Sequence, residues 1–147
     1  MITGARDRAP CETGGLLVGY WAQSGSEVVI TEATLPGPNA IETTDSFTPD
    51  YDFDRELIAR RFISSDERYT YLGDWHSHPE GEIYLSPDDL QALRVIGETP
   101  AAKAGRPLMI VVGGEESSGL GAWIWLGVKG ALFWKRNIVE AVPLRVV

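Results

Sequence analysis

The stretch "GDWHSHPEGEIYLSPDD", residues 73–89, contains both histidines of this chain, followed by a serine and two aspartates. If the chain is extended up to His78, side-chain alternation places His76 and His78 on one face of a strand and Trp75 and Ser77 on the other. Segment 79–85 is long enough to loop out and back, so that Asp89 could approach both imidazoles. Two histidine nitrogens and one carboxylate oxygen are a common ligand set for catalytic zinc, with the fourth position left to water.

The end of the same stretch also has the pattern of a helix start. Ser86 suits the N-cap position, Asp89 follows three residues later, and Leu85 with Leu90 would form a hydrophobic staple. We expect this helix to end near Gly97, with that glycine in the left-handed region. A helix cap and a polar, half-exposed strand face would explain the same residues without chemistry, so both interpretations stay open at this point.

The remaining chain predicts a mixed sheet with helices packed against it, an α/β (α+β) fold. A helix over residues 51–63 should begin at Thr48 and pack Phe53, Leu57, Ile58 and Phe62 inward. The acids between residues 45 and 54 are expected on a solvated face. The apolar run 107–114 is typical of a central strand. Further strands are expected at 14–21 and 27–35 (as a hairpin), 69–78, 119–128, 130–136 and 139–147, with a long loop at 36–50.

Composition limits the class of protein. The 147 residues, 44% of them hydrophobic, suit one domain over residues 1–147. A formal charge of −8 disfavours nucleic acid and membrane surfaces as partners. The single cysteine, Cys11, precludes an intrachain disulfide, and no secretory signal or membrane span is evident, so we expect a cytoplasmic protein.

A hydrolytic zinc site also needs a general base, and both histidines are already assigned as ligands. Glu12, just before the apolar strand that begins with two glycines, is a candidate. The pattern alone does not distinguish it from Glu80 or Glu82.

Other reactive or aromatic residues have simpler interpretations. Asp74 shares the histidine face and could orient a ligand, although we expect a surface role. Cys11 as a nucleophile would need one of the two histidines, so we disfavour it. The tryptophans are expected to pack in the core or at sheet edges: Trp75, Trp123, Trp125 and Trp134.

Taken together, these residues resemble the signature of the JAMM (MPN-plus) metalloproteases. That signature is a Glu, then His-x-His, seven residues, and Ser-x-x-Asp. Here it is matched by Glu12, by His76 and His78, by the seven residues 79–85, and by Ser86 with Asp89. In element order, the resemblance covers roughly residues 11–127.

The resemblance implies a mixed sheet sandwiched by helices, similar to the cytidine-deaminase architecture, and a zinc-dependent hydrolase. His76, His78 and Asp89 would be the zinc ligands, Glu12 the general base, and Ser86 the donor to the oxyanion. Such enzymes cleave isopeptide or peptide bonds after the C-terminal tail of ubiquitin or a ubiquitin-like protein. Bacterial relatives often accompany ubiquitin-like conjugation enzymes, some in anti-phage operons, or sulfur-carrier pathways.

Two alternatives follow from the same resemblance: a peptidase that trims a sulfur-carrier protein tail, and a non-catalytic MPN scaffold. The substrate tail would add a strand at a free edge supplied by residues 36–45 or 80–85.

The chain also departs from the family pattern in two ways. Only eleven residues precede Glu12, so the usual first helix is expected to be missing or to lie upstream, with one sheet face less covered. The segment 98–106 is too short for the insertion by which larger deubiquitinases hold ubiquitin, so we expect no narrow linkage specificity.

Overall fold

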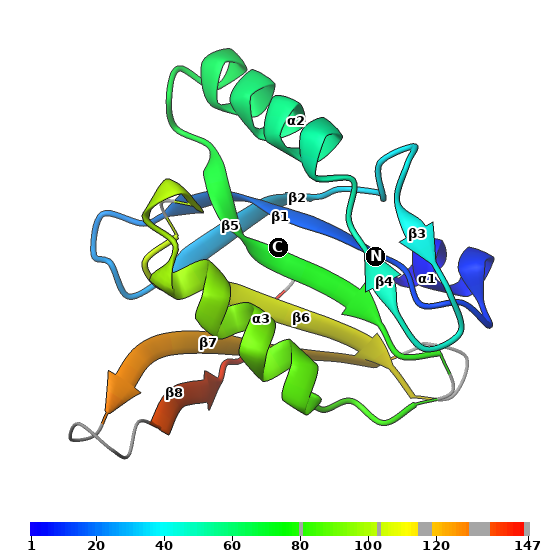
Figure 1. Cartoon of the computed structure of the whole chain (residues 1–147). Coiled ribbons are helices and arrows are strands. Elements are labelled where there is room, and N and C mark those ends of the chain that lie inside the picture. Colours follow the sequence, from blue (N-terminus) through cyan, green and yellow to red (C-terminus); the bar gives the residue numbers. More distant parts are fainter. Residues whose placement is uncertain (80, 103, 115–118, 130–135, 146–147) are drawn as a thin grey trace.

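The computed structural model describes residues 1–79, 81–102, 104–114, 119–129 and 136–145 (Figure 1). It contains a six-stranded sheet in the order β2-β1-β5-β6-β7-β8 and a separate two-stranded sheet, β3-β4. β5 and β6 are parallel, and the other neighbours are antiparallel. The predicted mixed sheet with packed helices is therefore confirmed. The strands are β1 Gly14–Trp21, β2 Val28–Ala33, β3 Ile41–Glu42, β4 Phe47–Thr48, β5 Thr70–Ser77, β6 Leu108–Gly113, β7 Gly119–Lys129 and β8 Arg136–Ala141; the helices are α1 Ile2–Arg8, α2 Tyr51–Ser64 and α3 Pro87–Glu98, followed by a 3-10 turn at Pro100–Ala102.

Helices α2 and α3 lie over one face of the large sheet, with β5 running between them (Figure 1). Under α3, the core consists of Leu93 packed with Met109, Val111 and Trp125. The opposite face packs the larger apolar cluster, which includes Leu17, Leu72, Trp75, Leu108, Ile110 and Val112. The central strand β6 is buried along its whole length, as predicted from its apolar run.

The expectation that the first helix would be missing is wrong. α1 precedes Glu12, and its Ala5 is completely buried in the cluster on the face opposite α2 and α3. Met1 and Ile2 pack against the same cluster. The seven residues of α1 therefore cover part of that face.

The start of α2 differs from the prediction at Thr48. Thr48 belongs to β4, and Asp50 is the N-cap, where its Oδ1 accepts a hydrogen bond from the Phe53 backbone at 3.3 Å. Its other oxygen accepts bonds from the backbone and side chain of Asn39, both at 3.0 Å. The bond from the Asn39 backbone is the main cause of a lowered pKa at Asp50. The expected solvated acidic face is therefore wrong for Asp50, and also for Asp54, which is only 7% exposed.

The inward face of α2 was predicted only in part. Leu57 is buried and Phe53 and Ile58 are half-buried, but Phe62 is 37% exposed near the helix end. Of the three predicted C-terminal strands, the first corresponds to β7. The last, predicted over 139–147, is wrong for residues 142–145, because β8 ends at Ala141. The candidate at 130–136 lies almost entirely outside the described residues, as does Trp134. Among the described helices, none is long and apolar enough to cross a membrane.

The helix α3 begins as predicted but ends differently. Ser86 is the N-cap, with a complete capping box to Asp89. The helix continues through Gly97 to Glu98, and the C-cap is Thr99 with φ −92°. Gly97 is therefore not a left-handed terminator; a Cβ at this position would overlap with the ring of Trp125.

We predict that Gly97→Ala destabilises the protein by about 1–3 kcal/mol, because overpacking against Trp125 outweighs the roughly 1 kcal/mol that alanine gains in a helix. The matched control is Gly105→Ala, where a Cβ would meet no atom within 4 Å. Urea unfolding midpoints of both variants check the prediction. A Gly97→Ala variant as stable as the parent would contradict the proposed contact.

Candidate metal centre

The two histidines and Asp89 converge where β5 ends and α3 begins. The His76 Nε2 and His78 Nε2 atoms are 3.0 Å apart. Asp89 Oδ1 lies 3.1 Å from His76 Nε2, and Asp89 Oδ2 lies 3.6 Å from His78 Nε2. Among the described residues, these three form the group whose donor atoms could hold a metal ion.

The three donors are close enough to share one metal ion. With one donor atom from each residue, these atoms all lie within 4.8 Å of one another. Two imidazoles and a carboxylate are a donor set that zinc accepts. The residues present therefore fit a metal ion of the zinc type.

Neighbouring groups orient these side chains. The His78 Nδ1 atom lies 3.4 Å from the Glu82 backbone carbonyl, a contact that leaves Nε2 as the lone-pair atom when Nδ1 carries the proton. The Tyr84 ring packs against the His78 ring at 5.7 Å. Ser77 points to the opposite face, as alternation predicted, and its Oγ accepts a hydrogen bond from the Thr13 backbone at 3.0 Å. This bond ties the histidine strand to the start of β1, next to Glu12.

Glu12 lies beside the cluster, half-buried in the same groove as the three donors. Burial is the main cause of its raised pKa, and the neighbouring His78 and His76 act in the opposite direction. Glu82 also borders the groove, but its side chain is exposed and its backbone carbonyl faces His78. Glu80 lies outside the described residues. Of the two candidates that the structure describes, Glu12 is the half-buried one, and it stays our candidate for the general base.

Ser86 serves as a helix cap and retains a donor for chemistry. Its Oγ accepts a hydrogen bond from the Asp89 backbone at 3.2 Å, while its own backbone N–H donates to Asp89 Oδ2 at 2.7 Å. A hydroxyl has two lone pairs and one O–H, so the cap leaves the proton free for another acceptor. For Asp89, burial opposes ionisation, but the hydrogen bonds from His76 and His78 outweigh it and hold the pKa well below its usual range.

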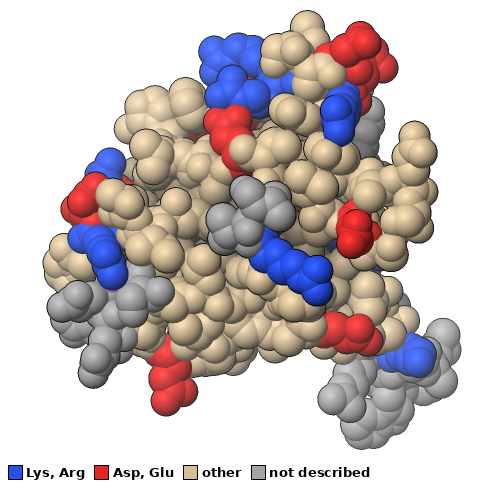
Figure 2. Space-filling model, turned by 180° about the vertical axis from the view of Figure 1, so that it is seen from behind, with Lys and Arg blue, Asp and Glu red and all other residues tan. Residues whose placement is uncertain are grey.

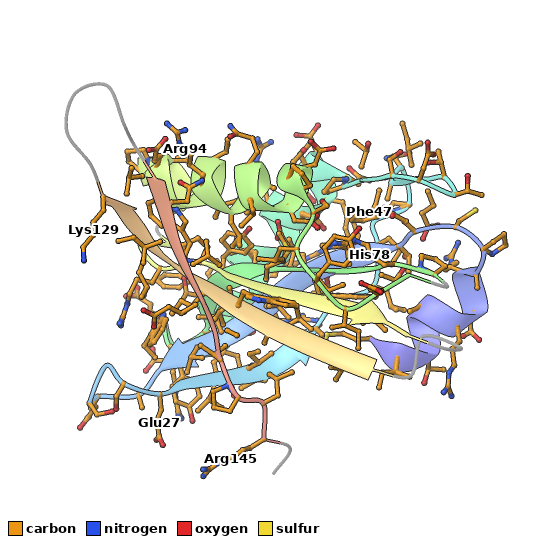
Figure 3. All side chains as sticks on the ribbon, turned by 90° about the horizontal axis from the view of Figure 1, so that it is seen from below. Glu27, Phe47, His78, Arg94, Lys129 and Arg145 are labelled. Carbon is orange, nitrogen blue, oxygen red and sulfur yellow. The ribbon has the colours of Figure 1, made fainter. Side chains whose placement is uncertain are left out.

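A groove of about 1070 Å³ runs from the metal centre along β5 between α2 and α3. The β3-β4 hairpin and residues 81–84 flank the metal end of this groove. Figure 3 shows Phe47 and His78 at the same end of the sheet, on the side that carries α3. β3 is paired with β4, and residues 81–85 contain no strand. Residues 81–85 therefore do not supply the free strand edge that was predicted for the substrate tail.

Several residues lining the groove were missed or misjudged from sequence. The expected surface role for Asp74 is wrong: it lies on the groove face and accepts a hydrogen bond from the Tyr71 hydroxyl at 2.8 Å. Burial raises the pKa of Asp74 to about 6, and the bond from Tyr71 partly opposes this effect. Asp54, on α2, lines the same region, and burial together with Asp50 raises the pKa of Asp54 to about 6.

The described tryptophans pack as predicted. Trp75 is 1% exposed, and its indole donates to the Thr34 carbonyl at 2.9 Å. Trp125 is buried in the cluster under α3, and Trp123 packs against this cluster.

Comparison with known proteins agrees with this geometry. The family of prokaryotic homologs of the JAB domain matches residues 1–136. The chain belongs to this family. It is 39% identical to the probable metalloprotease y4qB of Sinorhizobium fredii over 90% of this chain and 82% of that protein. It is also 30% identical to a CD-NTase/cGAS isopeptidase of Enterobacter hormaechei, over 71% of this chain but only 56% of that protein.

Solved structures share the JAB fold at low sequence identity. A JAB1/MPN domain protein, AF2198 from Archaeoglobus fulgidus, has a TM-score of 0.50 at 18% identity, covering 99% of this chain and 87% of that one. Protein DSY2949 from Desulfitobacterium hafniense has a TM-score of 0.51, also at 18% identity, over 84% and 76% of the two chains. These likenesses support the fold of this JAB-family chain.

We predict that Asp54→Asn stabilises the protein at pH 8 by up to about 3 kcal/mol, because it removes an unpaired buried charge. The folded-state pKa of about 6 lies above the ordinary 3.8, so the folded protein binds this proton more tightly. Stability should therefore fall as pH rises from about 4 to 6, and the penalty should be fully present above that range. The gain from Asp54→Asn should disappear near pH 4. Urea unfolding at both pH values, with the exposed Glu56→Gln as control, tests this; a gain of equal size at both would contradict it.

Proposed function

We propose that this chain is a zinc-dependent isopeptidase or peptidase that cleaves after the C-terminal tail of a ubiquitin-like protein. His76, His78 and Asp89 would hold the zinc ion. The observation that carries the proposal is that these three donors converge beside Glu12 at one end of a long groove. Membership in the JAB family supports the same conclusion.

When bound, zinc supplies a Lewis acid that polarises the scissile carbonyl and lowers the pKa of a water molecule toward about 7. Glu12 accepts the proton of the attacking water and delivers it to the departing amine. The Ser86 hydroxyl donates a hydrogen bond to the oxyanion that develops on the carbonyl. The groove along β5 would hold the tail in an extended conformation on the acyl side of the cleaved bond.

The substrate class is supported by the relatives. Two of them are named CD-NTase/cGAS isopeptidases, which supports an isopeptide bond as the bond cleaved. The β3-β4 hairpin borders the groove and has a strand edge to which an extended tail could add. Trimming of a sulfur-carrier tail would use the same residues, so cleavage of fusions to each kind of tail separates the two substrates.

The complete donor set favours an enzyme over a non-catalytic scaffold. A scaffold would not need Glu12 and Ser86 placed around three converging donors. Zinc content of the purified protein, measured by mass spectrometry, tests this: about one ion per chain is expected, and metal-free protein after incubation with zinc would contradict the proposal.

We predict that Glu12→Gln lowers turnover of a ubiquitin-like fusion by at least about a hundredfold, because the amide cannot accept the proton. Zinc content should stay at about one ion per chain, since Glu12 is not one of the three donors. His78→Ala, by contrast, should lose both zinc and activity. The assay is cleavage of the fusion followed by gel and mass spectrometry, with a chelator control. A Glu12→Gln variant of normal activity would remove Glu12 from the mechanism.

We predict that Ser86→Ala has two separable effects. Loss of the N-cap should lower the free energy of unfolding by about 1 kcal/mol. Loss of the hydroxyl donor should lower kcat by roughly 10²-fold, far more than such a small change in folded population explains. Urea unfolding and steady-state kinetics measure the two effects. A variant that loses stability but retains kcat would limit Ser86 to the cap.

A further inference from the structure

The Asp54 carboxylate is buried in the groove with one oxygen unpaired. Its side chain comes from α2 and lines the groove, yet the residue is only 7% exposed. Its Oδ1 atom has no hydrogen-bond partner among the described residues. Burying a carboxylate without a partner costs free energy. A positively charged group from outside the described residues would offset this cost.

The groups that face Asp54 do not supply this compensation. Asp50, one turn earlier on α2, is itself acidic and uses its oxygens at the helix cap. On the facing strand β5, the Tyr71 hydroxyl donates to Asp74. Asp74 is also an acid and lines the same groove. The local field at this point of the groove is therefore negative.

No arginine of the described chain neutralises these acids. Arg55 borders the groove, but its side chain is 78% exposed and pairs with Asp52. Arg61, further along α2, pairs with Glu32 on β2. Among the described residues, the groove is lined by seven acids, two histidines and one arginine. The opposite face of the molecule differs, because its acidic and basic side chains are scattered over a mostly uncharged surface (Figure 2).

A β-bulge assembles this part of the groove. The pairing of β1 with β5 shifts between Leu17 and Val18, and Gly73 has φ +143°. Leu72 therefore joins the core cluster on the opposite face, while Tyr71 and Asp74 share the groove face. Without the bulge, regular alternation would have placed Tyr71 and Asp74 on opposite faces of the sheet.

The position along β5 relates these acids to the scissile bond. Asp74 precedes His76 by two residues on the same face, about 7 Å along the strand. An extended substrate has the same rise per residue, so its side chain two residues from the bond at the metal centre reaches Asp74. Asp54, on α2, lines the same groove, so substrate residues further from the bond would pass it.

We propose that Asp54 and Asp74 form a subsite that binds the guanidinium or ammonium group of a basic residue, the third to fifth residue before the scissile bond. This inference rests on the proposed function for the direction of the substrate. Arg or Lys there would pair with the orphan oxygen of Asp54 and give the enzyme a preference for basic tails.

The test measures peptide binding, so it does not depend on turnover. The probes are fluorescein-labelled alanine-glycine peptides with one arginine at each of the second to fifth residues before the scissile amide, and matched peptides with neutral citrulline. Binding to the zinc-loaded full chain carrying Glu12→Gln is followed by fluorescence polarisation. We expect arginine to be preferred over citrulline by roughly ten- to a hundredfold at one or more of the third to fifth residues.

Two further variants separate the subsite from general effects. Asp54→Asn should abolish the preference for arginine without weakening binding of the citrulline peptide, and Glu56→Gln, on the exposed face of the same helix, should retain the preference. Thermal unfolding of each variant monitors folding. The proposal is overturned if arginine is not preferred at any position, or if the preference survives Asp54→Asn.

Parallel cleavage assays of the parent chain distinguish the two proposals. Arginine-selective binding without hydrolysis of any substrate would overturn the proposed function and leave the subsite standing. Zinc-dependent hydrolysis without arginine selectivity would overturn the subsite alone.

Discussion

The carboxylate of Asp89 joins the start of a helix to the end of a sheet. One oxygen accepts the Ser86 backbone N–H at 2.7 Å, and the other faces His76 Nε2 at 3.1 Å. The same residue therefore completes the capping box of α3 and the donor set. Because α3 also buries Leu93 against β6, its position is set by core packing, and the donor geometry is stabilised together with the fold.

β5 supplies the other half of the site from the centre of the sheet. Its buried face contributes Trp75 to the core, and Ser77 binds the strand to Thr13, next to Glu12. Its groove face presents His76 and then His78, just past the strand end. Two candidate ligands on and next to such a strand have little freedom to move, which is the condition for a preorganised centre.

Buried acids distinguish the groove from the rest of the surface. In the part of the chain that the structure describes, no cation is paired with Asp54, although burying this carboxylate costs stability at neutral pH. Such a cost is typical of binding sites, where a group is left unsatisfied in the free protein for a ligand to satisfy. Stability and recognition are therefore expected to oppose each other at Asp54, since the variant that removes the charge should be both more stable and less selective.

The sequence by itself determined the parts of this protein that depend on local rules. Alternation placed His76 and His78 on one face, the capping pattern located the start of α3, and the apolar run identified β6, because each depends on residues close in the chain. Only the tertiary structure placed Glu12 half-buried in the groove and left the Glu82 side chain exposed, since this difference depends on how β1 is paired with β5. It also decided that Gly97 accommodates Trp125, that Asp50 is the cap of α2, and that the bulge places Tyr71 with Asp74. These features arise from contacts between distant segments, and neither composition nor periodicity encodes which segments meet.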